Sequence, residues 1–275
     1  MRVLIAILLF LCMFAIYIYA ENKQLKVRKY KISANIPKGK KIKIVHISDI
    51  HKNKYPKNWS YPLNLIKNLQ PDVIFITGDL VSRTETNFEQ IGVFIKRLCE
   101  ICPVYCINGN HELDLSDENM NEYRKMLNNS GAFFLENAKA EFVKEDIKIN
   151  IYGASLKKSV YKNKDGGYKN LEKYTAKELE EIFGKPESPS LLLAHNPIFF
   201  NEYAKWGADI TFSGHIHGGI INTPKGGLLS PERKFFPKYT KGVYKLKDKN
   251  MIVSTGIGKL RIFNPPEIIY LLFFF

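Results

Sequence analysis

The sequence predicts an α/β fold of layered strands and helices, preceded by one N-terminal transmembrane helix. Short apolar runs rich in Val and Ile alternate with stretches of helical spacing, and residues 3–20 carry no charge. The 275 residues allow one large domain or two small ones. A hydrophobic content of 45% and only four cysteines exclude a collagen-like chain, a disordered chain and a disulfide scaffold.

The N-terminal segment has the length and composition of a membrane anchor. Val3–Ala20 would form a helix about 27 Å long, close to the hydrocarbon thickness of a bilayer. The alternatives are a cleaved signal peptide and a buried helix of a soluble protein. The apolar run is long for a signal peptide, and the bulky Ile18 stands where cleavage after Ala20 needs a small residue. We therefore expect residues 1–21 to be an uncleaved signal-anchor that crosses a cell membrane once.

A strongly basic segment follows the apolar one. Residues 21–45 contribute a net charge of +8 to the total of +14, because one acid, Glu21, stands against nine Lys and Arg residues: Lys23, Lys26, Arg28, Lys29, Lys31, Lys38, Lys40, Lys41 and Lys43. Such a run indicates an anionic partner, and its place beside the apolar segment favours a membrane surface over nucleic acid. We interpret residues 22–40 as a basic juxtamembrane linker. Arg2 favours an internal N-terminus and the basic run favours the opposite topology, so both orientations stay open.

Strands and helices are expected to alternate through residues 41–275, the main domain. The apolar runs that predict strands are Ile42–Ile47, Val73–Thr77, Val104–Ile107, Ile147–Tyr152, Leu191–Ala194, Ile210–Phe212 and Met251–Thr255. Helices are expected after the capping residues Ser60, Asn87, Ser116 and Thr175. Ile268–Phe273 is expected to be a last strand rather than a surface for acyl chains. Cys99, Cys102, Cys106 and His46 are interpreted as core residues.

Polar residues follow five of the predicted strands directly. Because functional crevices of α/β sheets lie beyond the carboxyl ends of the strands, we expect these residues to meet. They are Asp49, His51, Asp79, Asn110, His111, His195, His215 and His217. Carboxylate, imidazole and amide groups in this number exceed the needs of one tetrahedral zinc ion and fit two divalent ions that share a bridging carboxylate.

These residues stand in motifs that resemble those of the calcineurin-like metallophosphoesterases. The matching motifs, in order, are Asp49-x-His51, Gly78-Asp79, Gly109-Asn110-His111-Glu112, His195 and Gly214-His215-x-His217. The apolar N-terminus and Asn264-Pro265-Pro266-Glu267-Ile268 are similar to the membrane-associated bacterial branch, which includes phosphodiesterases and UDP-2,3-diacylglucosamine pyrophosphatases. Ile216 and Ile220 depart from the Thr and Gln common in the family.

The resemblance implies a fold, a cofactor and a set of residue roles. The fold would be a four-layer α-β-β-α sandwich of two mixed sheets flanked by helices. The cofactor would be two divalent ions, with Mn favoured over Fe or Zn. The first ion would be held by Asp49, His51 and His217, the second by Asn110, His195 and His215, with Asp79 bridging. His111 would be the catalytic proton donor, and Asn110, His111 and His195 would contact substrate.

The expected function is that of a membrane-anchored phosphoesterase, monomeric, acting on a phosphodiester or a lipid-linked pyrophosphate. The reaction would proceed by attack of a metal-bridging hydroxide. The alternatives are a nuclease or phosphomonoesterase of the same fold and a non-catalytic lipid-binding protein.

Overall fold

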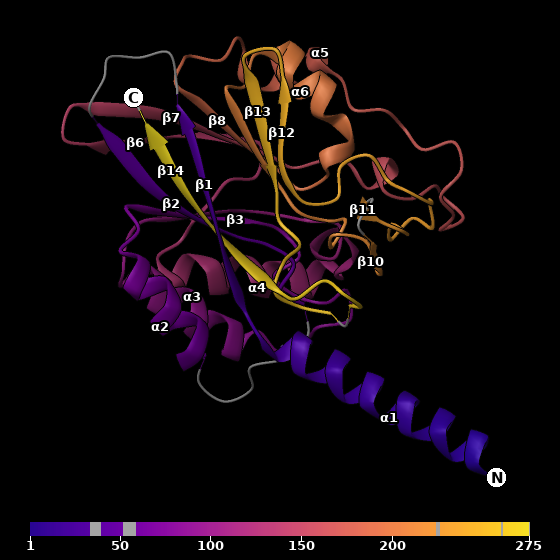
Figure 1. Ribbon diagram of the computed structural model, residues 1–275. Helices are drawn as coiled ribbons and strands as arrows, with labels where there is room; N and C mark the ends of the chain where they lie inside the picture. The colour runs from indigo at the N-terminus through magenta and orange to yellow at the C-terminus, as the bar shows by residue number, and fades with distance from the viewer. Residues whose placement is uncertain (34–39, 52–58, 224–225, 260, 275) are drawn as a thin grey trace.

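Two six-stranded sheets stacked face to face form the centre of the molecule (Figure 1). The computed structural model describes residues 1–33, 40–51, 59–223, 226–259 and 261–274. The first sheet has the order β1 (Lys26–Ser33), β14 (Glu267–Phe274), β2 (Lys41–Ile47), β3 (Val73–Thr77), β4 (Val104–Ile107) and β5 (Phe133–Phe134). The second has the order β12 (Gly242–Leu246), β13 (Lys249–Val253), β9 (Ile210–Ser213), β8 (Ser190–Ala194), β7 (Ile147–Ala154) and β6 (Ala138–Lys144).

Both sheets are mixed, and helices cover their outer faces. In the first sheet β14 runs antiparallel to β2, while the other neighbours are parallel. In the second, β12–β13 and β6–β7 are the antiparallel pairs. Helices α2 (Ser60–Leu69), α3 (Glu89–Cys99) and α4 (Asp117–Ser130) cover the first sheet, and α5 (Ala176–Phe183) and α6 (Phe200–Trp206) cover the second. The expected four-layer α-β-β-α sandwich is confirmed.

Alternating side chains divide each central strand between two cores. In β3, Val73 and Phe75 join the core between the sheets, whereas Ile74 and Ile76 pack against the helices of the first sheet. Since successive side chains of a strand point to opposite faces, a continuous apolar run is what a doubly covered strand requires. Ile268–Phe273 lies within β14, so the prediction of a last strand is confirmed.

Local signals placed the helix ends with mixed success. Ser116 caps α4 by accepting from the Asn119 N–H, and Thr175 and Glu178 form the predicted capping box of α5. The caps predicted at Ser60 and Asn87 are wrong by one residue, because Trp59 and Phe88 occupy the N-cap positions. The Asn87 side chain still accepts from the Glu89 N–H at 2.9 Å.

The basic segment differs from the expected linker over residues 22–40. Helix α1 (Arg2–Lys23) extends into it, and Lys26–Ser33 forms β1, which pairs in parallel with β14 along its whole length. The alternation explains this: Tyr30 and Ile32 pack on the core between the sheets, and Lys29 and Lys31 are exposed at the sheet edge. Lys38 lies outside the described residues.

Helix α1 projects away from the domain; its C-terminal end joins the domain and its N-terminal end is the free tip (Figure 1). Among the described residues it is the helix long and apolar enough to cross a membrane, and almost all of its apolar surface is exposed. Asn22 fixes its base: its side-chain oxygen accepts from the Arg261 N–H at 3.0 Å, and its amide donates to the Arg261 carbonyl at 2.6 Å.

Candidate metal centre

Loops from both sheets bring the predicted site residues to one place. Asp49 and His51 follow β2, Asp79 follows β3, and Asn110 and His111 follow β4. From the second sheet, His195 follows β8, and His215 and His217 follow β9. In both sheets these loops leave the carboxyl ends of parallel strands, where crevices of α/β folds form. All but Asn110 are buried, and its side-chain oxygen is buried.

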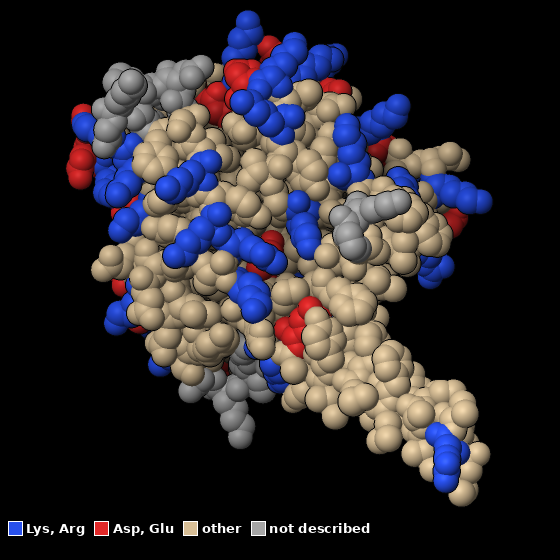
Figure 2. Space-filling view, in the orientation of Figure 1, with Lys and Arg blue, Asp and Glu red and all other residues tan. Residues whose placement is uncertain are grey.

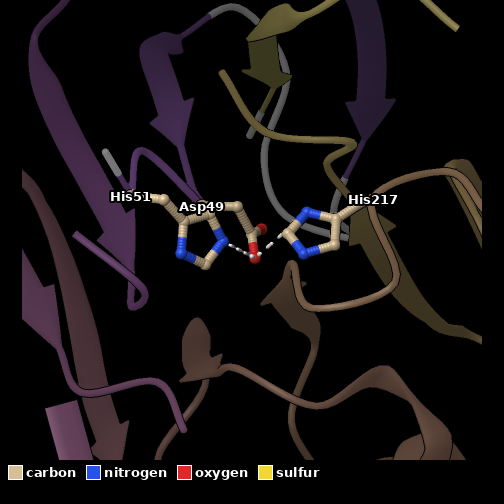
Figure 3. A group of neighbouring side chains, drawn as sticks. All are labelled: Asp49, His51 and His217. Atoms are coloured by element: carbon tan, nitrogen blue, oxygen red, sulfur yellow. Dashed lines mark ion pairs between the residues drawn. The ribbon is translucent and has the colours of Figure 1, made fainter. Parts of the chain in front are cut away.

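Asp49 is the centre of one group of possible ligands. Its carboxylate faces the rings of His51 and His217, which approach it from opposite sides (Figure 3). Asp49 Oδ1 lies 3.9 Å from His51 Nε2 and 3.6 Å from His217 Nδ1. The same carboxylate accepts from the His215 N–H at 3.1 Å, which ties the loops after β2 and β9 together.

Asp79 is the centre of two further groups, one of which shares His51 with the first. Its Oδ2 lies 3.4 Å from His195 Nε2, 3.6 Å from His51 Nε2 and 3.9 Å from His111 Nε2. His215 joins Asp79 and His195 in a group whose candidate ligand atoms are all within 4.8 Å of one another. Asp79 is therefore the carboxylate that faces both sides of the site.

Several buried nitrogen and oxygen atoms of these residues have no hydrogen-bond partner in the described part of the chain. They are Nδ1 and Nε2 of His51, Oδ1 of Asn110, Nε2 of His195 and Nδ1 of His217. An unsatisfied buried polar atom costs roughly 1–3 kcal/mol, so this many in one place calls for a missing partner. Divalent cations of the Mn, Fe and Zn type bind imidazole nitrogens and carboxylate or amide oxygens as ligands, and these residues fit a pair of such cations.

The charges inside the site depend on one another. Burial acts to raise the pKa of Asp79, but the imidazoles of His195, His51 and His111 outweigh it and hold that pKa well below its usual range. Burial likewise acts to lower the pKa of His195, while Asp79 and Asp49 raise it to about 9. Because a histidine binds metal in its neutral form, metal binding here would release protons.

The backbone is strained where these residues stand. Asp49, His51, Asp79, His215 and His217 all have φ between 49° and 71°, a region that costs a residue with a Cβ roughly 1–2 kcal/mol. Such strain concentrates at functional sites, where the surroundings fix it. Gly109 and Gly214 leave no room for a Cβ beside Asp79 and Asp49 respectively, so the backbone itself packs against both carboxylates.

Glu112 holds two of the loops together from below the site. It is fully buried, and its carboxylate accepts from the backbone N–H groups of Asp79 at 2.9 Å, Gly109 at 2.7 Å and Val81 at 3.1 Å. The carboxylate thus fixes the loop after β3 against the loop after β4. Sequence reasoning placed Glu112 in a motif without giving it a role.

We expect Glu112→Gln to destabilise the fold by about 2 kcal/mol, because an amide offers one acceptor oxygen and turns a donor toward an N–H group. Urea unfolding measures the change. Glu136→Gln is the matched control, since Glu136 pairs with Arg124 at the surface and its loss should cost no more than about 1 kcal/mol. Equal stability of the two variants would show that Glu112 does not hold the loops.

A cavity of about 260 Å³ opens over the Asp79 side of the site. Its walls include four cationic side chains that sequence reasoning did not select: Arg83, Lys158, Lys162 and Lys259. The Asp114 carboxylate forms ion pairs with three of them, at 3.7 Å from Arg83, 2.7 Å from Lys158 and 2.6 Å from Lys162. The cavity therefore has a positive wall suited to phosphate oxygens.

His111 lies between this wall and Asp79. The Arg83 N–H donates to its Nδ1 at 3.2 Å, and Lys259 Nζ lies 3.4 Å from its Nε2. Burial, with Lys259 and Arg83 beside the ring, lowers the pKa of His111 to about 4. The imidazole is thus held in its neutral form by burial and by these cations.

Two further residues complete the description of the site. His46 is fully buried in β2, where its Nε2 lies 2.8 Å from Thr77 Oγ1, as expected of a core histidine. Glu232, which sequence reasoning missed, contacts His215 Nε2 and lines the cavity. Its position in a loop far along the chain gave no local signal.

Comparison with known proteins places this geometry in context. The model of the family described as calcineurin-like phosphoesterase matches residues 42–219. The metallophosphoesterase YkoQ of Bacillus subtilis is 26% identical over 270 residues, which cover 94% of each chain. The phosphodiesterase YaeI of Escherichia coli is 22% identical over 88% of this chain and 84% of its own. The UDP-2,3-diacylglucosamine pyrophosphatase LpxG of Chlamydia muridarum is 23% identical over 82% of each chain.

Solved structures support the fold. A putative 5'-nucleotidase from Staphylococcus aureus superposes with a TM-score of 0.51 at 13% identity, covering 80% of this chain and 49% of that one. At that identity the likeness concerns the fold alone.

Proposed function

This chain belongs to the calcineurin-like phosphoesterase family, and we propose that it cleaves a phosphodiester or pyrophosphate bond at a membrane surface. Members of this family are metal-dependent phosphoric ester hydrolases, and this chain is one of them. The observation that carries the proposal is the cluster around Asp49 and Asp79, with its buried ligand atoms that lack partners. The names of YaeI and LpxG support a phosphodiester or pyrophosphate as the substrate class.

We assign two divalent ions to the cluster. Asp49, His51 and His217 would hold one, Asn110, His195 and His215 the other, and Asp79 would bridge them. Asp79 belongs both to a group with His51 and to the group with His195 and His215, which supports this division. Mn is the favoured metal. Fe and Zn are alternatives, because all three metals take carboxylate and imidazole ligands. When bound, such a pair supplies a strong nucleophile at neutral pH and neutralises charge on the phosphoryl group.

The chain's own residues would handle the substrate and one proton. Arg83, Lys158, Lys162 and Lys259 would bind phosphate oxygens in the cavity, with Asp114 fixing the first three. Asn110 and His195 would orient the phosphoryl group from the floor of the site. His111 Nε2, which faces the cavity between Asp79 and Lys259, would deliver a proton to the leaving oxygen.

The proposed location is a bacterial cell membrane, with α1 as a single N-terminal pass. The 22-residue helix has almost no buried apolar surface, and the basic β1 edge follows it directly. An anionic bilayer surface satisfies both features. A lipid-linked pyrophosphate would then reach the cavity from the membrane in which the enzyme is held.

Hydrolysis of a substrate panel by the full chain under Mn²⁺ tests the proposal. The panel is an aryl phosphodiester, an aryl phosphomonoester, a cyclic nucleotide, DNA and a sugar-nucleotide lipid. We expect turnover of the aryl diester and the sugar-nucleotide lipid, lost on chelation and restored by Mn²⁺. Activity confined to the monoester would contradict the substrate class. Activity on DNA that falls steeply with salt would indicate a nuclease.

A further inference from the structure

An exposed apolar surface runs from helix α1 to the mouth of the cavity. Phe263 is its first element: it is 46% exposed, and its ring lies 5.9 Å from that of Phe14 and 6.0 Å from that of Tyr17. Phe14 stands nine residues before Lys23, which is about 13 Å along a helix. If α1 spans a bilayer, Phe263 therefore lies at the level of the lipid rather than above it.

The surface continues from Phe263 into the segment between residues 220 and 238. Ile262, beside Phe263, pairs in parallel with Ile221, and its N–H donates to the Ile220 carbonyl at 3.1 Å. Ile220 is 44% exposed and lines the cavity. In this segment β10 (Asn222–Thr223) and β11 (Gly226–Gly227) pair in antiparallel orientation.

Phe235 and Phe236 lie at the far end of this segment. They are 70% and 61% exposed, and Phe235 has the largest exposed fraction of any described aromatic side chain. The Phe236 N–H donates to the Leu228 carbonyl at 2.9 Å, and Phe235 pairs with Leu229, so the backbone of both residues is tied to residues 228–229. Exposed cations flank them at Arg233, Lys234 and Lys238.

We propose that residues 220–223 and 226–238, which we name the interfacial loop, dock on the lipid surface and place the mouth of the cavity at the bilayer. Aromatic rings flanked by Lys and Arg are the composition that binds the headgroup region of anionic membranes. The loop's continuity with α1 through Phe263 selects a lipid surface as the occupant. In Figure 1, β10 and β11 lie on the side of the domain from which α1 emerges, and Figure 2 shows the projecting helix tan along most of its length, with blue at its free end.

The interfacial loop rests on the proposed membrane anchoring but is a separate contact. The helical anchor holds the domain near the bilayer through its base, where Asn22 bonds to Arg261. Docking of the interfacial loop fixes the orientation, because Ile220, Pro231 and Glu232 line the cavity as part of the same segment. A lipid-linked phosphate would then enter without leaving the headgroup region.

Tryptophan fluorescence of the full chain tests the contact. Three single variants are reconstituted in vesicles of phosphatidylcholine and phosphatidylglycerol in equal amounts, with and without brominated acyl chains as quenchers. Phe236→Trp reports on the interfacial loop and Phe10→Trp on α1. Val143→Trp is the control: Val143 is 57% exposed on β6, which lies away from α1 in Figure 1. The native Trp59 and Trp206 are buried and supply a constant background.

We expect brominated lipid to reduce the added emission of Phe236→Trp and of Phe10→Trp and to leave Val143→Trp unchanged. In these anionic vesicles, the Lys234→Glu substitution is added to Phe236→Trp. Loss of quenching in that double variant would support the role of the flanking cations. Quenching of Phe10→Trp alone would overturn the inference while leaving the anchor in place. Quenching of neither would overturn both. None of these readings depends on turnover, so failure of the proposed chemistry is detected separately.

Discussion

Replacing Asp79 with alanine is expected to remove both metal ions and reduce turnover to background. The Asp79 carboxylate is the group shared by two of the three ligand clusters, and it also accepts from the His111 N–H at 2.8 Å. Its loss leaves the imidazoles of His51, His195 and His111 facing one another without a negative charge between them. Elemental analysis of the purified variant measures the effect.

The matched control for this variant is Asp72→Ala. Asp72 precedes the same strand, β3, whose other end leads to Asp79, and it pairs with Lys144 at 2.9 Å. Its removal costs an ion pair of similar kind and should leave metal content and turnover intact. Retention of two ions by Asp79→Ala would show that the carboxylate does not bridge.

Replacing His111 with alanine is expected to spare metal binding and to slow hydrolysis of substrates with poor leaving groups by roughly 10²–10⁴-fold, the range typical of a general acid. His111 lies in only one of the three clusters, and its pKa of about 4 in the free protein reflects burial and the nearby Lys259 and Arg83. A bound phosphate anion acts against these cations and favours the protonated ring.

The leaving group provides the internal control for His111→Ala. An aryl diester with an acidic phenol needs no proton to depart, so its kcat should change little, whereas an alkyl diester should show the full loss. An equal loss with both leaving groups would indicate that His111 binds or positions the substrate instead. Unchanged turnover of the alkyl diester would remove His111 from the reaction.

The central strands and the site could be predicted because both signals are local. Strands covered on both faces are continuous apolar runs, and β3 and β4 begin and end where the sequence predicts. Residues of metal-binding types directly follow those runs. They lie at one edge of each sheet, because the carboxyl ends of parallel strands are at the same edge. Asp79 and His195 are 116 positions apart in the chain, yet each was found from its own strand end.

The edges and supports of the fold could not be predicted in this way. Strand β1 reads as a linker because lysines occupy its exposed face, and β6 (Ala138–Lys144) and β12 (Gly242–Leu246) are similarly polar edge strands. Arg83, Lys259 and Glu232 reach the cavity only through long-range packing. The three N–H bonds to Glu112 depend on the meeting of two loops, which no spacing in the sequence encodes.

The proposed position of Asp79 between two cations is tested most directly by anomalous X-ray diffraction from crystals of the full chain grown with Mn²⁺. We predict two anomalous peaks per chain, one beside Asp49, His51 and His217 and one beside Asn110, His195 and His215, with the Asp79 carboxylate contacting both. A single peak, or two peaks of which Asp79 touches one or neither, would contradict the account.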